Sequence, residues 1–163
     1  MVNQKTSSIK KTIIRSIINT PSIVNLLDAN VEYTDDLINT HVFPHLKIDY
    51  TVENVGTYIG IKIDYPDILD SNQLYKDFLL TVLIISNNQH LKTESGDSRT
   101  DLLGEEILDL FNWSNTLPFV FRLKVCTDIE NPLDEDFYFR KIIFESFTPN
   151  SIENGVKINN GQI

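Results

Sequence analysis

The sequence predicts an α+β domain, in which helices pack on a mixed or antiparallel sheet of four to five strands. Two observations predict this class: some segments alternate apolar and polar residues with the period of a strand, and others repeat apolar residues with the period of a helix. The 163 residues suffice for one domain with a hydrophobic core. We expect that domain at 1–147, with a helical segment at 1–42, the sheet and main helix at 45–147, and a C-terminal extension at 148–163.

The N-terminal segment is expected to form three short helices. Ile9, Ile13 and Ile17 recur at helical spacing, and a preceding serine can cap this first helix. A proline can begin a second helix at 21–29, and another proline ends a third helix at 34–42. We interpret this segment as an appendage of the domain that depends on neighbouring proteins for its contacts.

Three segments between the N-terminal helices and the main helix have the character of strands. Residues 55–65 alternate, which places Ile59, Ile61 and Ile63 on one buried face. Residues 45–52 show a shorter and weaker pattern. The central strand is expected at 74–86, and because it is apolar on both faces we expect both faces to be covered.

The main helix is expected at 98–111. Its apolar residues fall on one inner face: Leu102, Leu103, Ile107, Leu110 and Phe111. Ser98 followed by Asp101 resembles a capping box at the start of the helix. Gly104 is a poor helix former, so its position indicates close packing against the sheet.

Two strands and an acidic turn are expected after the helix. Alternation at 119–126 predicts a strand that buries Cys126 as an inert thiol. The acidic residues at 128–135 predict a turn. The last strand is expected at 136–147, with a bulge at 140–141 because the alternation slips there. The chain that follows is rich in Asn and Gly and poor in core residues, which is typical of turns.

Charge and composition exclude several classes of protein. The net charge is −9 and the isoelectric point is about 4.7, so the chain is not expected to grip nucleic acid through its phosphates. Acidic side chains could instead line a passage along which DNA slides, because like charges repel. No apolar run reaches the roughly 20 residues that a membrane helix needs, and no signal peptide is evident, so we expect the protein in the cytoplasm.

No residue pattern indicates a catalytic or metal site. His41 and His45 have the spacing of two ligands on one helix turn, but Pro44 breaks the helix between them. The single Cys126 excludes an internal disulfide and a zinc site built from several cysteines. The carboxylate pairs fit helix starts and turns, so we expect no enzyme activity and no cofactor.

The candidate functional residues are polar and surround the loop at 87–96, which looks mobile. The loop leaves the central strand, and a dense polar cluster at 97–101 then opens the main helix. Helix capping and a local Arg–Asp pair explain most of that cluster. For Arg99 the alternative is a contact with another subunit, because arginine is enriched at interfaces. We predict an interface formed by the following residues: Asn87, His90, Lys92, Glu94, Asp97, Arg99 and Arg15.

The order of elements and three short motifs resemble a known group of proteins. The motifs are Val42-Phe43-Pro44, Val55-Gly56-Thr57-Tyr58-Ile59 and Asp97-Ser98-Arg99-Thr100-Asp101-Leu102-Leu103. Together they are similar to the neck and tail-completion proteins of tailed bacteriophages, and most of all to the tail terminator group. The similarity covers about 37–147. The long N-terminal helical segment and the Asn/Gly-rich tail depart from the group's pattern.

The resemblance implies a structural protein of the virion, assembled in the host cytoplasm. Such proteins form a ring, usually a hexamer, that ends the tail tube and docks to the portal-side head connector, with genomic DNA passing through the lumen. The resemblance implies no cofactor, catalytic residue or membrane. We expect acidic residues such as Glu94 and Asp97, or those at 128–136, to face the lumen.

Other functions remain open at this point. The departures from the group's pattern leave a connector-ring or tail-adaptor role possible. A different class is an acidic monomer that mimics DNA and inhibits a host DNA-acting enzyme; it predicts one contiguous acidic surface. A hydrolase or nuclease with an unrecognised site would predict divalent metal binding.

Overall fold

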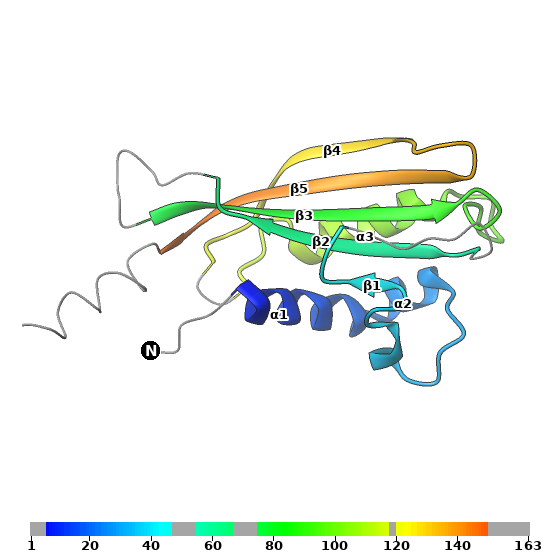
Figure 1. Ribbon diagram of the computed structural model, residues 1–163, viewed down its shortest axis with the longest axis horizontal. Helices are drawn as coiled ribbons and strands as arrows, with labels where there is room; N and C mark the ends of the chain where they lie inside the picture. The colour runs from blue at the N-terminus through cyan, green and yellow to red at the C-terminus, as the bar shows by residue number, and fades with distance from the viewer. Residues whose placement is uncertain (1–5, 47–54, 67–74, 118–119, 150–163) are drawn as a thin grey trace, which may run out of the picture.

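A five-stranded sheet forms the centre of the protein (Figure 1). The computed structural model describes residues 6–46, 55–66, 75–117 and 120–149. The strands are β1 (Val42–Phe43), β2 (Thr57–Asp64), β3 (Tyr75–Asn87), β4 (Lys124–Pro132) and β5 (Phe137–Pro149). Their order in the sheet is β1-β2-β3-β5-β4; β1 pairs with β2 in parallel and every other pair is antiparallel. This mixed sheet with its helices confirms the predicted α+β class.

The helices gather on one side of this sheet. They are α1 (Thr6–Ile18), α2 (Pro21–Leu27), the 3-10 helix η1 (Thr34–Leu37) and α3 (Arg99–Phe111). In Figure 1, α3 lies behind β2 and β3, while α1 and α2 run below the sheet beside β1. Gly104 allows α3 to approach β5 closely, as predicted, because a Cβ there would meet the Arg140 guanidinium.

The N-terminal helices belong to the main hydrophobic core and are not an appendage. Five isoleucines of α1 are almost fully buried: Ile9, Ile13, Ile14, Ile17 and Ile18. They share one cluster with the inner residues of β2, β3 and α3. Each buried apolar side chain of this size stabilises the fold by roughly 1.5–3 kcal/mol, so this helical segment needs no neighbouring protein to hold it.

The two faces of β3 differ in how they are covered. Phe78, Leu80, Val82 and Ile84 face the helices and are fully buried. On the opposite face, a small cluster of Tyr58, Ile85 and Phe137 is buried, whereas Leu79 and Leu83 are half-buried. The expectation that both faces are covered therefore holds for the helix side and only in part for the other.

Several predicted elements have different boundaries in the structure. The third helix is a single 3-10 turn, η1, and residues 42–43 form β1 instead. The predicted strand at 45–52 lies almost wholly outside the described residues, and so does the extension after 149. Ser98 precedes α3 as predicted, but its hydroxyl bonds the Thr100 hydroxyl at 2.9 Å, so the predicted capping box is not formed.

The segment before β4 contains the largest errors. The predicted strand at 119–126 starts outside the described residues, and within them β4 begins at Lys124, because the backbone of Leu123 bonds with Trp113 and Ser114 of the loop after α3. The bulge lies at Cys126 in β4, where the pairing with β5 shifts its register, and β5 is regular at 140–141. Cys126 is consequently exposed and not buried. The expected acidic turn is also shorter, because residues 128–132 continue β4.

Candidate functional site

Polar side chains from four elements meet where β2 begins and β3 ends. The Thr57 hydroxyl lies 2.8 Å from the Ser86 hydroxyl and 2.8 Å from His90 Nδ1. His90 Nε2 in turn lies 3.4 Å from the Asp28 carboxylate. A hydroxyl, an imidazole and a carboxylate in series resemble the arrangement of a catalytic triad. Both hydroxyl-bearing residues are completely buried, however, so a substrate could not reach them, and we interpret this network as structural.

Arg99 holds the same network from the start of α3. Its Nε donates to the carbonyl of His90 at 2.9 Å, and its Nη1 donates to the carbonyl of Leu26 at 2.6 Å. Its Nη2 lies 3.7 Å from the Asp28 carboxylate. The arginine is 8% exposed and its donors serve its own chain. The contact with another subunit stays a prediction.

The two histidines near this network are biased toward their neutral forms. Burial lowers the pKa of His90, and the charge of Arg99 lowers it further, while Asp28 acts in the opposite direction. Burial also lowers the pKa of His41, with a smaller contribution from the nearby His90. The His41 ring stacks on Tyr58 with centroids 5.5 Å apart. Neutral imidazoles are therefore the stable form at neutral pH.

The loop at 87–96 is connected to the rest of its own chain by hydrogen bonds. Its first residue, Asn87, is buried at the end of β3, and its place in an interface stays a prediction. Asn88 donates from its backbone to Asp136 and from its side chain to Glu135. A backbone bond from Thr93 and a side-chain bond from Ser95 connect the far half of the loop to Asp97. His90 is half-buried, and four of the predicted interface residues are exposed: Arg15, Lys92, Glu94 and Asp97.

A second charged cluster surrounds Arg140 on the helix side of β5. Its Nε and Nη2 donate to the two oxygens of Asp128 at 2.8 and 2.7 Å, and its Nη1 donates to the carbonyl of Asp101 at 3.0 Å. The bond to Asp128 raises the pKa of Arg140. Glu130 has a raised pKa, chiefly through a hydrogen bond with Asp101. Within the described ranges, no group of three or more His, Cys, Asp or Glu side chains could hold a metal ion.

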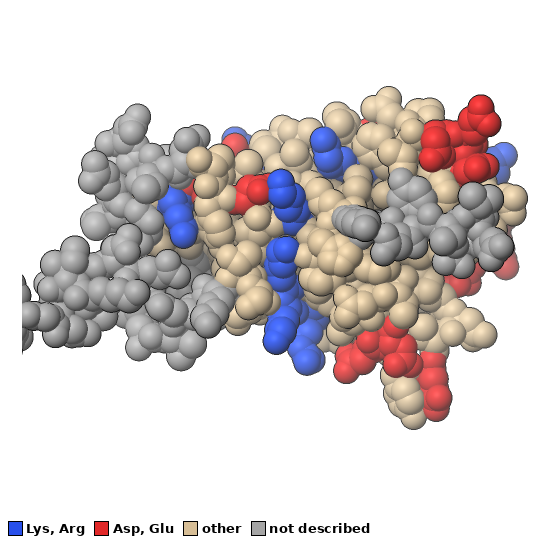
Figure 2. All heavy atoms as spheres, in the orientation of Figure 1, with Lys and Arg blue, Asp and Glu red and all other residues tan. Residues whose placement is uncertain are grey.

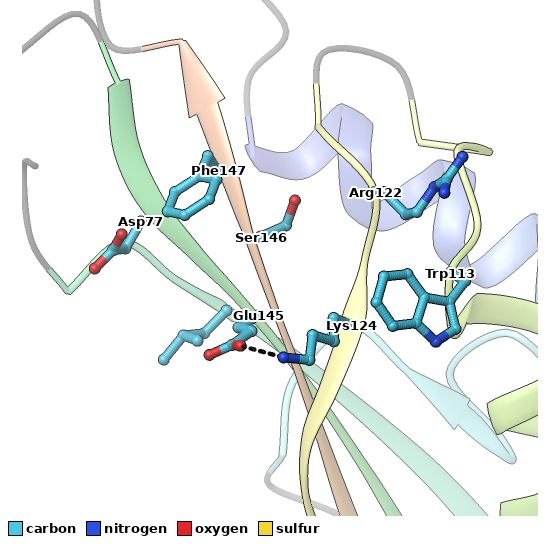
Figure 3. A pocket seen from close by; sticks show the side chains of 8 residues that line it. Asp77, Trp113, Arg122, Lys124, Glu145, Ser146 and Phe147 are labelled. Carbon is cyan, nitrogen blue, oxygen red and sulfur yellow. Dashed lines mark ion pairs between the residues drawn. The ribbon is translucent and has the colours of Figure 1, made fainter. Parts of the chain in front are cut away.

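A pocket of about 290 Å³ opens between the first residues of β4 and the last residues of β5 (Figure 3). Its lining combines aromatic and charged side chains: Asp77, Leu79, Trp113, Arg122, Lys124, Glu145, Ser146 and Phe147. Lys124 and Glu145 face each other across it at 4.0 Å. The Ser146 hydroxyl is buried and has no hydrogen-bond partner among the described residues. A polar group of this kind normally finds a partner.

Sequence reasoning missed this pocket because its walls come from distant parts of the chain. Trp113 follows the C-terminus of α3 with a positive φ of 61°, and it is 59% exposed. Phe121 and Phe147 lie beside each other through a backbone bond of 3.0 Å, and both are about half exposed. The chain's single tryptophan after a helix end was the available signal, since tryptophan is enriched at binding surfaces.

These features define the class of protein: a small α+β chain whose polar clusters are engaged within its own fold, with an open pocket lined by aromatic residues. The chain belongs to the YomW family, whose model matches residues 10–146. That family is derived from Bacillus phage, so the chain is a phage-associated protein. No curated protein matches the chain. None of the helices in the described part of the chain is long and apolar enough to cross a membrane.

Proposed function

We propose that the protein is a structural component of the phage neck or tail, a tail terminator-like ring subunit that joins the tail tube to the head connector. The observation that carries this proposal is the exposure of large aromatic side chains on two separate surfaces. Tyr33 beside η1 is 65% exposed, and Trp113, Phe121 and Phe147 are 46–59% exposed around the pocket. A ring subunit needs two different contact surfaces, one for each neighbour.

Family membership and charge support the same proposal. A phage-derived family is where a neck or tail protein is expected. Acidic residues gather at the end of the molecule that holds η1 and the turn between β4 and β5 (Figure 2). Acidic side chains on a lumen repel DNA phosphates, so DNA would pass through without binding. The partners are then copies of the chain, proteins of the head connector and proteins of the tail tube.

Deleting the gene from the phage tests this proposal. A missing terminator ring leaves tube growth without a stop, so lysates should contain tails of variable length and heads without tails. Supplying the protein from a plasmid should restore particles of normal form. Heads and tails that join normally in the deletion mutant would contradict the proposal. Tails of normal length with unjoined heads would favour a connector-ring or tail-adaptor role.

A second candidate is an acidic monomer that inhibits a host DNA-acting enzyme. It is favoured by the gathering of acidic residues at one end of the molecule (Figure 2). The exposed acids beside η1 and in the turn between β4 and β5 include Glu32, Asp35, Asp134, Glu135 and Asp136. This function predicts that the purified chain binds a basic host enzyme and leaves phage particles unchanged when it is deleted. The deletion experiment therefore separates the two functions.

A further inference from the structure

We propose that the acidic turn around Tyr33 of one copy inserts into the aromatic pocket of the next copy, and that this contact repeats around the assembly. The acidic knob is defined as Glu32, Tyr33, Asp35 and Asp36, and the aromatic pocket as the cavity bounded by Trp113, Arg122, Lys124, Ser146 and Phe147. This inference rests on the proposed ring function and names the contact that would build the ring.

The acidic knob presents an aromatic side chain at a fixed place on the surface. Tyr33 is the most exposed large apolar side chain of the described residues. The Asp36 carboxylate accepts a hydrogen bond from the Tyr33 backbone at 3.3 Å, and the Asp36 backbone donates to the Tyr33 carbonyl at 3.0 Å. These two bonds fix the turn before η1, so little conformational freedom would be lost when the side chain is buried.

The aromatic pocket has the size and chemistry to receive a tyrosine. Its volume of about 290 Å³ lies at the lower limit of small-molecule pockets, which are roughly 300–1,000 Å³. Trp113 and Phe147 supply apolar walls on opposite sides (Figure 3). Ser146 is 6% exposed and its hydroxyl is buried beneath the pocket, so an entering side chain does not reach it. A tyrosine that enters the pocket would bury apolar area against the two aromatic walls.

The acidic knob is complementary in charge to Arg122 of the pocket. It carries three exposed carboxylates, of which that of Asp36 already accepts the bond from the Tyr33 backbone. Among the pocket's charges, Lys124 and Glu145 pair with each other at 4.0 Å. Arg122 Nε donates to Asn115 Oδ1 at 3.5 Å, and the guanidinium has no carboxylate partner among the described residues. Asp77 is a negative charge on the opposite wall, beside Phe147 (Figure 3), so the carboxylates of the knob would approach from the Arg122 side.

The positions of the two surfaces favour a repeating contact. In Figure 1, η1 lies at the lower right, whereas the start of β3 and the end of β5, which line the aromatic pocket, lie toward the left. A knob and a pocket on different parts of one chain cannot satisfy each other in that chain. They produce a heterologous contact, which leaves one knob and one pocket free in any open chain of subunits. Closure into a ring uses both.

Cross-linking between two single-cysteine proteins tests the contact directly. In a Cys126→Ser background, a Thr34→Cys protein is mixed with an Asn115→Cys protein and oxidised; both positions are exposed, one beside Tyr33 and the other in contact with Arg122 of the pocket, so the contact residues themselves are kept. We expect a mixed disulfide dimer from this pair. The matched control replaces Thr34→Cys with Leu133→Cys, which lies in an exposed position at the turn between β4 and β5. A yield no higher than that of the control pair would overturn the inference.

A charge exchange tests the chemistry of the contact by sedimentation velocity. Arg122→Glu should weaken self-association about tenfold, because it places like charges together at the contact. Asp35→Arg alone should have a similar effect, and the two changes together should restore association. Lys92→Glu, on the exposed loop, is the matched control and should leave association unchanged. The inference would be overturned if the Arg122→Glu protein associated as strongly as the original chain. It would also be overturned if the original chain remained monomeric at high concentration.

The aromatic ring is tested with Tyr33→Ala, which removes it from the knob. We expect association to weaken about tenfold, because the apolar area that the ring would bury in the pocket is lost. A Tyr33→Ala protein that associates as strongly as the original chain would overturn the inference. Failure of this contact can be distinguished from failure of the ring function. A chain that enters particles through another surface would overturn the contact alone, whereas absence from particles would overturn the function.

Discussion

Replacing Gly104 with Ala should destabilise the protein, although alanine is the better helix former. A Cβ at this position would lie 2.5 Å from Cζ and Nη1 of Arg140 and 2.6 Å from its Nε, closer than real Cβ contacts come. The guanidinium would have to move. Its side chain is only 14% exposed and is held by both oxygens of Asp128 and by the carbonyl of Asp101.

The size of the effect follows from two opposing contributions. Alanine in place of glycine favours the helix by about 1 kcal/mol. Displacing the guanidinium costs hydrogen bonds to a charged group, each worth about 1.5–3 kcal/mol, and partial exposure of Asp128 reduces that value. Two such bonds outweigh the helix term, so we expect Gly104→Ala to lower the free energy of unfolding by about 1–3 kcal/mol. Urea unfolding followed by circular dichroism measures this.

The control removes the obstructing side chain. In an Arg140→Met background the charged bonds are already absent, so Gly104→Ala should be neutral or stabilising by up to about 1 kcal/mol. The sign of the glycine substitution should therefore change between the two backgrounds. The reasoning would be refuted if Gly104→Ala raised the free energy of unfolding when Arg140 is present. It would also be refuted if the substitution changed the free energy of unfolding equally in both backgrounds.

Three further predictions concern acidity, the thiol and the lumen. The free energy of unfolding should fall as the pH drops through 6.5, because burial lowers the pKa of His90 in the folded chain and the unfolded chain then binds protons more tightly. Urea unfolding at about pH 7.5 and about pH 5.5 should show a smaller fall for His90→Gln than for the original chain, and an equal fall in both proteins would contradict this. Cys126 is exposed at the bulge of β4, so a thiol reagent should react with it in the folded protein nearly as fast as in denaturant. A thiol that reacts only after the protein unfolds would contradict this prediction. A double variant, Asp134→Lys with Glu135→Lys, should slow DNA ejection from particles, because lysines in the lumen would attract DNA phosphates. Glu105→Lys on α3 is the control, and unchanged ejection kinetics of the double variant would exclude these acids from the lumen.

The elements with strong periodicity could be predicted from the sequence. The patterns of β2, β3 and α3 extend over eight to thirteen residues and are fixed by which face meets the core, so their existence and orientation followed directly. The close approach at Gly104 was also predicted, because a glycine inside a helix needs a packing reason. These are local signals that the tertiary fold reinforces.

The errors arose where distant contacts override the local pattern. Alternation before β4 suggested a strand, but Leu123 bonds with the loop after α3, and the bulge at Cys126 turns the thiol outward. The bond from Arg99 to the carbonyl of Leu26 could not be predicted either, because the two residues are 73 positions apart in the sequence. The aromatic pocket was missed for the same reason, since its walls come from four separate segments.

Quantitative mass spectrometry of purified phage particles tests the central claim most directly, by counting this protein against the portal subunit. The proposed terminator ring predicts about half as many copies as the portal, in keeping with a closed hexameric ring. Equal numbers would indicate a connector ring that matches the portal. Absence of the protein from the particles would contradict a structural role and would favour the acidic inhibitor.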